Sequence, residues 1–337
     1  MDKEWITNLP KVDLHAHLDG SLRPATVLEL AERPAAARRL PPIRDVTEAV
    51  IPPQRCTLEE YLRAFRITVA VLQTEEALKR AAYELCEDAA RENVIYIEIR
   101  YAPLLHLQEG LSPQQTVEAV LAGMQRAEES YPIRTGLILC AMKQESTTHS
   151  NRVAHLAAAY AEHGVVAVDL AGPERDFPPS RHRRAIEIAG EEGIAVTIHA
   201  GEGCCPEQIK EALDLGAHRI GHGVYLYRDA ATERRVTQME IPLEICPTSN
   251  LQISGVMDSY ADHPLKRYLD LGIRVTLNTD NRLMSQTDST NEFVQVIEAF
   301  SLTADAVKTI LTNSVEAAFA SDATKVALRE QVEAAFA

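Results

Sequence analysis

Several features that would reveal a protein's partners or location are scarce in this 337-residue sequence. Basic residues are in the minority, 34 against 49 acidic ones, and the net charge of −15 repels phosphate backbones and anionic lipid head groups. No apolar run approaches the length that spans a bilayer, and the first residues, MDKEWITNLPK, lack the apolar core of a signal peptide. We therefore expect a soluble, cytoplasmic protein that binds neither nucleic acid nor membranes.

Cysteine is also sparse, and several common functional motifs are missing. The six cysteines follow no CxxC spacing or regular framework, and a chain of this size does not depend on disulfides, so we expect reduced thiols. The GxGxxG turn, the GxxxxGK phosphate cradle and the GxSxG hydrolase turn are absent. These absences argue against the common dinucleotide-binding, P-loop and serine-hydrolase sites.

What the sequence does contain is an alternation of short apolar runs with helical segments. Each run is rich in Val, Ile and Leu and ends in polar residues or in Gly and Pro. The eight runs cover residues 11–17, 93–103, 133–143, 164–174, 194–203, 218–226, 241–250 and 273–281. Eight buried strands separated by helices predict an α/β fold, and an open doubly wound sheet would give much the same local pattern. Because the count is eight and no GxGxxG turn follows a strand, we expect a (β/α)8 TIM barrel that forms a single domain over residues 1–337.

The interval between the first two apolar runs is too long for a single βα unit. About two βα units' worth of chain separates the first two runs, and we expect a helical lid insertion over about residues 24–90. Its last part, TLEEYLRAFRITVAVLQ, places Leu58, Tyr61, Leu62 and Phe65 on one helical face. An insertion after a first strand would lie over the C-terminal mouth of the barrel, where such enzymes keep their sites. A helix packed on the flank of the barrel remains an alternative.

Polar residues gather where the apolar runs end. A polar group in a buried strand must be paired or ligated to offset its desolvation. His15 and His17 are two residues apart on one strand, so both side chains can point to the same face and bind one ion. Imidazoles and a carboxylate from different strand ends suit a first-row divalent cation, zinc first, in a catalytic site that keeps a position open for water. The residues at the run ends are His15, His17, His199, Glu202, His222, Asp280 and Asn281.

Several other titratable residues are not expected to bind the metal. Glu202 lies in the glycine-rich turn AGEG, where it can be near a metal without binding it. We take Cys204 and Cys205 as loop residues, because the patterns HxE and PCxxC of the His/Cys zinc deaminases are absent. His106 and His182 lie in loop-like or helical sequence, and we expect both to be solvated.

Six motifs in register carry a resemblance to a known family. They are VDLHAHLDGSL, VDLAGPE, TIHAGEG, RIGHG, LEICPTSN and TLNTDN, and together they resemble the adenosine deaminase family of the amidohydrolase superfamily over about residues 9–315. The resemblance implies a (β/α)8 barrel with one zinc ion per subunit. It implies zinc-dependent hydrolytic deamination of adenosine and 2′-deoxyadenosine to inosine products and ammonia, in which an activated water attacks purine C6. It leaves the oligomeric state open.

The resemblance also assigns roles to individual residues. Glu202 would protonate purine N1, His222 would accept a proton from the zinc-bound water, and Asp280 would orient that water. The zinc ligands would be His15, His17, His199 and Asp280. The residues implied to contact the substrate are His17, Asp19 at the ribose 5′-hydroxyl, the backbone N–H of Gly172 at N3, Asn281, and Leu62 and Phe65 of the lid. The fourth run, VVAVDLAGPE, has no bridging lysine, so one metal is expected.

One departure from the family pattern leaves the substrate open. The family commonly has a second aspartate near purine N7, and this chain has Asn281, whose amide can donate a hydrogen bond to N7 without being protonated. A deaminase of a modified adenosine, such as an aminodeoxyfutalosine-like compound, is an alternative, because the loops set the distal sugar pocket. A deaminase of free adenine is a second, against which Asp19 argues. A non-catalytic purine-binding barrel is a third, and it would be expected to have lost a ligand, Glu202 or His222.

Overall fold

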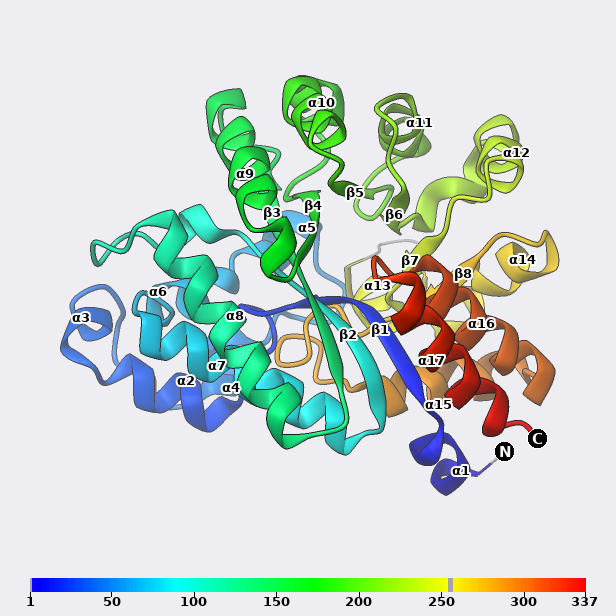
Figure 1. Ribbon diagram of the computed structural model, residues 1–337, viewed down its shortest axis with the longest axis horizontal. Coiled ribbons are helices and arrows are strands. Elements are labelled where there is room, and N and C mark those ends of the chain that lie inside the picture. The colour runs from blue at the N-terminus through cyan, green and yellow to red at the C-terminus, as the bar shows by residue number, and fades with distance from the viewer. Residues whose placement is uncertain (1, 254–256) are drawn as a thin grey trace.

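The centre of the protein is a sheet of eight parallel strands, seen in a computed structural model that describes residues 2–253 and 257–337 (Figure 1). Each strand pairs in parallel with the next one in the chain, so the order runs from β1 to β8 without a crossover. The strands are β1 (Lys11–His17), β2 (Val94–Tyr101), β3 (Arg134–Met142), β4 (Val165–Ala171), β5 (Ala195–Ala200), β6 (Arg219–His222), β7 (Leu243–Ile245) and β8 (Val275–Leu277). Each lies inside one of the eight predicted runs.

The sheet closes through the segment that follows β8. The backbone N–H of Asp280 donates to the carbonyl of His15, and the N–H of His17 donates to the carbonyl of Asp280, both at 2.7 Å. The side-chain oxygen of Asn278 accepts the N–H of Leu14 at 2.8 Å. A consecutive order with the last strand meeting the first is a barrel, so the predicted TIM barrel is confirmed and the open sheet is excluded.

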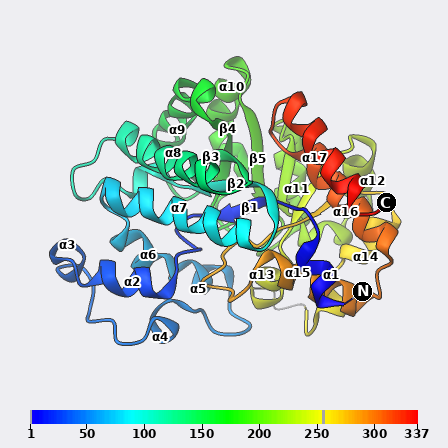
Figure 2. The same ribbon diagram turned by 60° about the horizontal axis from the view of Figure 1, so that its bottom comes forward.

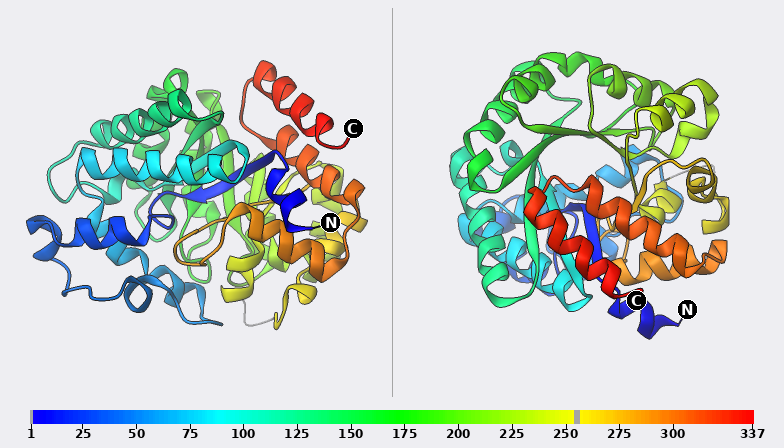
Figure 3. Two further views of the ribbon diagram at one scale, coloured as in Figure 1. Left: turned by 90° about the horizontal axis from the view of Figure 1, so that it is seen from below. Right: turned by 45° about the vertical axis from the view of Figure 1, so that its right-hand side comes forward.

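The helices that follow the strands form an outer ring around the barrel (Figure 3). They are α7 (Glu75–Arg91), α8 (Pro113–Ser130), α9 (Thr147–Ala159), α10 (Arg183–Glu191), α11 (Pro206–Asp214), α12 (Ala230–Gln238), α14 (Leu265–Asp270) and α16 (Ala304–Ala317). Side chains before several helices start them. Ser112 and Gln115 form a reciprocal capping box at α8, and Thr74 caps α7. No helix in the described ranges is long and apolar enough to cross a bilayer.

Further helices lie at the ends and in the longer loops. They are α1 (Lys3–Asn8), α13 (Pro247–Ile253), α15 (Ser289–Phe300), α17 (Asp322–Ala334) and the 3₁₀ turns η1 (Pro103–Leu105), η2 (Ala161–His163), η3 (Pro179–His182), η4 (Val224–Arg228) and η5 (Tyr260–Asp262). The chain termini lie close together in every view (Figure 2). The rings of Trp5 and Phe336 meet there edge to face, with centroids 5.7 Å apart.

The long interval after β1 folds into short helices beside the barrel (Figure 2). They are α2 (Pro24–Ala31), α3 (Pro34–Ala37), α4 (Val46–Val50), α5 (Leu58–Leu62) and α6 (Phe65–Val71). The last helix before β2, α7, packs against α8 and β2 as a member of the outer ring. The residues of the insertion that line the central cavity lie between Arg39 and Ala70.

Candidate metal and active site

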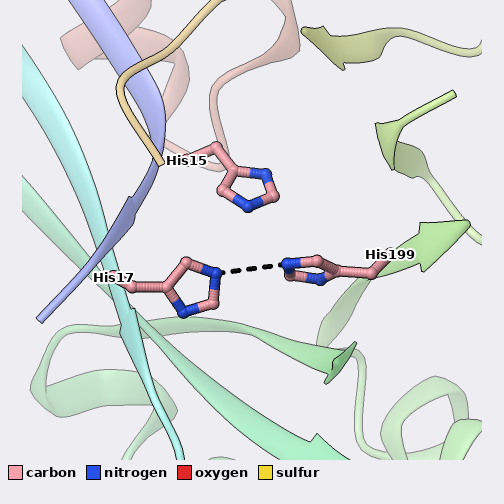
Figure 4. A group of neighbouring side chains, drawn as sticks. All are labelled: His15, His17 and His199. Atoms are coloured by element: carbon pink, nitrogen blue, oxygen red, sulfur yellow. Dashed lines mark hydrogen bonds between the residues drawn. The ribbon is translucent and has the colours of Figure 1, made fainter. Parts of the chain in front are cut away.

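Three strand ends bring histidines and an aspartate to one point. His15 and His17 end β1, His199 lies near the end of β5, and Asp280 follows β8. The three histidine rings point toward one another (Figure 4). Nε2 of His17 lies 3.2 Å from Nε2 of His199 and 3.4 Å from Oδ1 of Asp280. Oδ1 of Asp280 also lies 3.5 Å from Nε2 of His15, so three imidazoles and one carboxylate share one small volume.

The protonation of these rings fits a cation. Nδ1 of His15 donates to Glu244 at 2.7 Å, and Nδ1 of His199 donates to Asp169 at 3.0 Å. Burial lowers the pKa of His199, so that ring is neutral and its Nε2 is unprotonated. Nε2 of His15 is buried and has no hydrogen-bond partner within residues 2–253 and 257–337. Lone pairs and a carboxylate converging in a buried space repel one another unless a cation lies between them, and this donor set matches a divalent transition metal.

Two buried carboxylates orient the histidines, and one arginine joins them. The guanidinium of Arg100 lies 3.2 Å from Asp169 and 2.9 Å from Glu244, and all three side chains are inaccessible to solvent. Burial alone would raise the pKa of Glu244, but Arg100 and Arg219 outweigh it and hold that pKa well below its usual range. Both carboxylates are therefore ionised, and they fix the Nδ1–H tautomers of the rings in front of them.

Glu244→Gln is expected to destabilise the fold because it leaves Arg100 and Arg219 without their shared counter-charge. Removing one partner from a buried ion network costs about 3–5 kcal/mol of unfolding free energy. The matched control is Glu316→Gln, which breaks an ion pair with Arg329 that is about 40% exposed and screened by solvent. Urea unfolding of both variants measures the difference, and equal losses would contradict the buried-network assignment.

The turn after β5 presents a second acidic group. Glu202 is buried, and its Oε1 lies 3.5 Å from Nε2 of His222. The carboxylate of Glu174 holds this turn by accepting the N–H of Glu202 at 3.2 Å and the N–H of Gly203 at 2.9 Å. Burial raises the pKa of Glu202 well above its ordinary value, and the charges of Asp280 and Glu174 raise it further. The surroundings of Glu202 therefore favour its protonated, neutral form.

Unusual backbone conformations occur at the strand ends. His222 and Asp280 have φ of 66° and 58°, in the left-handed region that residues other than glycine rarely adopt. In the first motif, a Cβ at Gly20 would lie 1.8 Å from Oδ1 of Asn281, so only glycine allows these two segments to approach. The backbone thus accepts local strain and close contact where the site is assembled.

The predicted site residues surround one cavity of about 620 Å³. All of them except His15 line it, and His15 lies just behind the lining with no exposed surface. The insertion contributes Leu62 and Phe65 to the cavity wall, and their closing over a substrate stays a prediction. The predicted residues at the cavity wall are His17, Asp19, Leu62, Phe65, Gly172, His199, Glu202, His222, Asp280 and Asn281.

Two histidines that we expected to be solvated are buried. His182 bridges Ser150 and the carbonyl of Lys143, and His106 donates from Nδ1 to the carbonyl of Leu72 at 2.8 Å. Nε2 of His106 faces Asp19 at 3.9 Å, and burial raises the pKa of Asp19 to about 7. The expectation of solvation was wrong because sequence context places a residue in a loop but not the side of the loop that is covered.

Sequence reasoning also missed the residues that support the site. These are Glu98, Arg100, Asp169, Glu174, Arg219 and Glu244. Four of them carried a usable signal, because Glu98, Arg100, Asp169 and Glu244 interrupt otherwise apolar strand runs in the same way as the histidines do.

The comparisons with known proteins agree with this geometry. A model of the family described as adenosine deaminase matches residues 10–335. An adenosine deaminase from Clostridium acetobutylicum is 40% identical over 95% of this chain and 96% of its own length. The solved structure of an adenine deaminase from Arthrobacter aurescens is 30% identical, with a TM-score of 0.88 over 97% of this chain and 98% of that one.

Two further solved structures add ligands to the comparison. Arabidopsis ADAL complexed with IMP is 29% identical, with a TM-score of 0.90 over 98% of both chains. An amidohydrolase from Burkholderia ambifaria with bound zinc is 25% identical, with a TM-score of 0.91 over 99% of this chain and 92% of that one.

Proposed function

This chain belongs to the adenosine deaminase family of the amidohydrolase superfamily, and from that premise we propose that it hydrolyses adenosine and 2′-deoxyadenosine to the corresponding inosine and ammonia. The observation that carries the proposal is the position of Glu202. A buried carboxylic acid with a strongly raised pKa lies in the cavity wall beside the cluster of histidines and Asp280. Such an acid can protonate a ring nitrogen that water alone would leave neutral at pH 7.

The metal would be held by His15, His17, His199 and Asp280, whose donor atoms converge as described above. When bound, a zinc ion supplies a Lewis acid that lowers the pKa of a water molecule toward 7. One zinc per subunit is what this set of converging donor atoms supports. Asp169 and Glu244 hold the ligand rings in the tautomers that binding requires.

Glu202 would donate its proton to purine N1, which makes C6 electrophilic enough to add water. The ionised Asp280 would hold that water against C6; its Oδ2 is itself fixed by the hydroxyl of Ser249 at 2.5 Å. Of the two protons of that water, one would leave with the amino group as ammonia and the other would return to Glu202, which completes the exchange of an amino group for an oxygen. Leu62 and Phe65 would cover the purine and exclude bulk water, which preserves the raised pKa of the acid.

Recognition of the nucleoside would come from polar atoms in the same wall. Gly172 has a φ of 102° and lines the cavity, so its N–H can meet purine N3. Oδ1 of Asp19 is buried and has no hydrogen-bond partner in the described part of the chain, and it would accept the ribose 5′-hydroxyl. Asn281 lines the cavity and would donate to N7. His17 contacts the cavity as well as the metal cluster, so it would touch both substrate and ion.

A substrate panel tests the proposal. We expect the absorbance change of deamination with adenosine and 2′-deoxyadenosine, and a much lower kcat/KM with free adenine, because adenine leaves Asp19 buried and unpaired. Preference for adenine, or no turnover of any 6-aminopurine, would overturn the proposal.

A second candidate substrate is a 5′-extended adenosine with a negative charge. Arg39, Arg63 and Arg66 line the same cavity, although the protein as a whole is acidic. Adding adenosine 5′-monophosphate to the panel tests this reading. If the anion is the preferred substrate, the double variant R63Q/R66Q loses activity on the monophosphate while its activity on adenosine stays unchanged.

A further inference from the structure

A chain of buried hydrogen bonds leads away from His222 on the side opposite the cavity. Nδ1 of His222 lies 2.9 Å from the amide nitrogen of Asn250, and Oδ1 of Asn250 lies 3.2 Å from Nε2 of His263. These three side chains are at most 4% exposed. Nε2 of His222, at the cavity end of these bonds, has no hydrogen-bond partner among the residues that the structure describes.

Two backbone N–H groups fix the direction of every bond in this chain. The N–H of Cys246 points at Oδ1 of Asn250 at 3.3 Å, and the N–H of Leu265 points at Nδ1 of His263 at 3.0 Å. A backbone N–H can only donate, so Nδ1 of His263 is unprotonated and its Nε2 carries the proton. A flipped Asn250 would turn its own N–H2 group toward two donors, which excludes that orientation.

The remaining bond then has one possible polarity. With its oxygen facing Cys246 and His263, Asn250 turns its N–H2 group to His222, and an amide nitrogen donates but does not accept. Nδ1 of His222 is therefore the acceptor and carries no proton. A neutral ring has one proton, so that proton lies on Nε2 and faces the cavity.

We propose that Asn250, supported by His263, fixes the tautomer of His222 so that its Nε2–H serves the reaction as a hydrogen-bond donor. The proposal rests on the proposed function and deepens it. Asn250 is a positioning residue, since it acts through His222. The role differs from the one implied by the family resemblance, because a protonated Nε2 cannot accept a proton from the attacking water.

The direction of the hydrogen bond between Asn250 and His222 also decides between two alternative sets of metal ligands. Within the described residues, donor atoms of His15, His17 and His199 lie close enough to share an ion, and so do those of His15, His222 and Asp280. A ring nitrogen that carries a proton has no lone pair to give to a metal. His222 is therefore excluded from the ligand set, and its N–H is free to orient the water that adds to C6.

The tautomer can be measured directly by NMR on protein labelled with ¹⁵N-histidine, with and without zinc. In long-range ¹H–¹⁵N spectra we expect the signal of an unprotonated nitrogen at Nδ1 of His222 and of a protonated one at Nε2 in both states. The ring is assigned by the signals lost in His222→Gln. A protonated Nδ1 in the unmodified protein would overturn the proposal without any reference to activity, so this outcome is distinct from a failure of the substrate assignment.

Asn250→Asp replaces the side-chain nitrogen that donates to His222 with an oxygen that can only accept. Its carboxylate still accepts from Cys246 and His263 but has no hydrogen to give to His222, so the proton is expected to move to Nδ1. We expect kcat to fall by about 10²-fold with little change in KM, since a donor aimed at the reacting water is lost. Asn8→Asp, an exposed change in α1, is the matched control and should change neither the ring signals nor kcat. A moved proton with unchanged kcat would overturn the proposal, and if the variant does not fold the wild-type spectrum still decides.

Discussion

Glu202→Gln is expected to lower kcat by about 10²–10⁴-fold, the usual contribution of a general acid, while the protein remains folded. The amide keeps the size and polarity of the side chain but has no acidic proton to give to N1. Burial and the neighbouring carboxylates raise the pKa of Glu202, so the folded state already disfavours its charge and a neutral amide does not reduce stability. Steady-state kinetics and thermal unfolding measure the two effects separately.

The pH dependence gives this prediction a second readout. An acid must be protonated to act, so the kcat/KM of the wild-type protein should fall as pH rises through the raised pKa of Glu202. That alkaline decline should be missing from the residual activity of the Gln variant. Glu207→Gln, an exposed change in the following helix, is the matched control and should keep the full rate and profile. A near-normal rate in Glu202→Gln would remove Glu202 from the role of acid.

The barrel could be predicted from the sequence because its strands are buried on both faces. Such strands read as continuous apolar runs, and every strand from β1 to β8 lies inside a predicted run. The ends were less certain: β7 has three residues, although the corresponding run covers 241–250. The run continues because α13 (Pro247–Ile253) follows at once and is itself buried, and hydropathy does not separate a buried strand from a buried helix.

The site was predictable to the extent that its residues are chemically out of place. Histidines at strand ends signal a metal, and their convergence depends only on the parallel order of the strands. The direction of a hydrogen bond, in contrast, cannot be predicted from the residue types alone. Nothing in CPTSN indicates that the amide of Asn250 faces His222, because that depends on where Cys246 and Leu265 place their N–H groups in three dimensions. Roles that depend on tautomers therefore need the structure.

Removal of divalent metal is expected to abolish deamination, and zinc is expected to restore it. The four ligand side chains are preformed by Asp169, Glu244 and backbone pairing, so the metal-free protein should remain folded and bind zinc again. Zinc should then raise the unfolding temperature, because a ligand that binds only the folded state stabilises it by about 2.7 kcal/mol at a hundred times its Kd. Metal content is verified by elemental analysis before each assay.

A ligand variant separates this specific site from adventitious zinc binding. His199→Asn removes one converging Nε2 and should lose both the activity and the zinc-dependent rise in unfolding temperature. His155→Asn, a change at an exposed histidine of α9, should keep both. Activity that persists after verified metal removal would contradict the zinc assignment, as would equal stabilisation of His199→Asn by zinc.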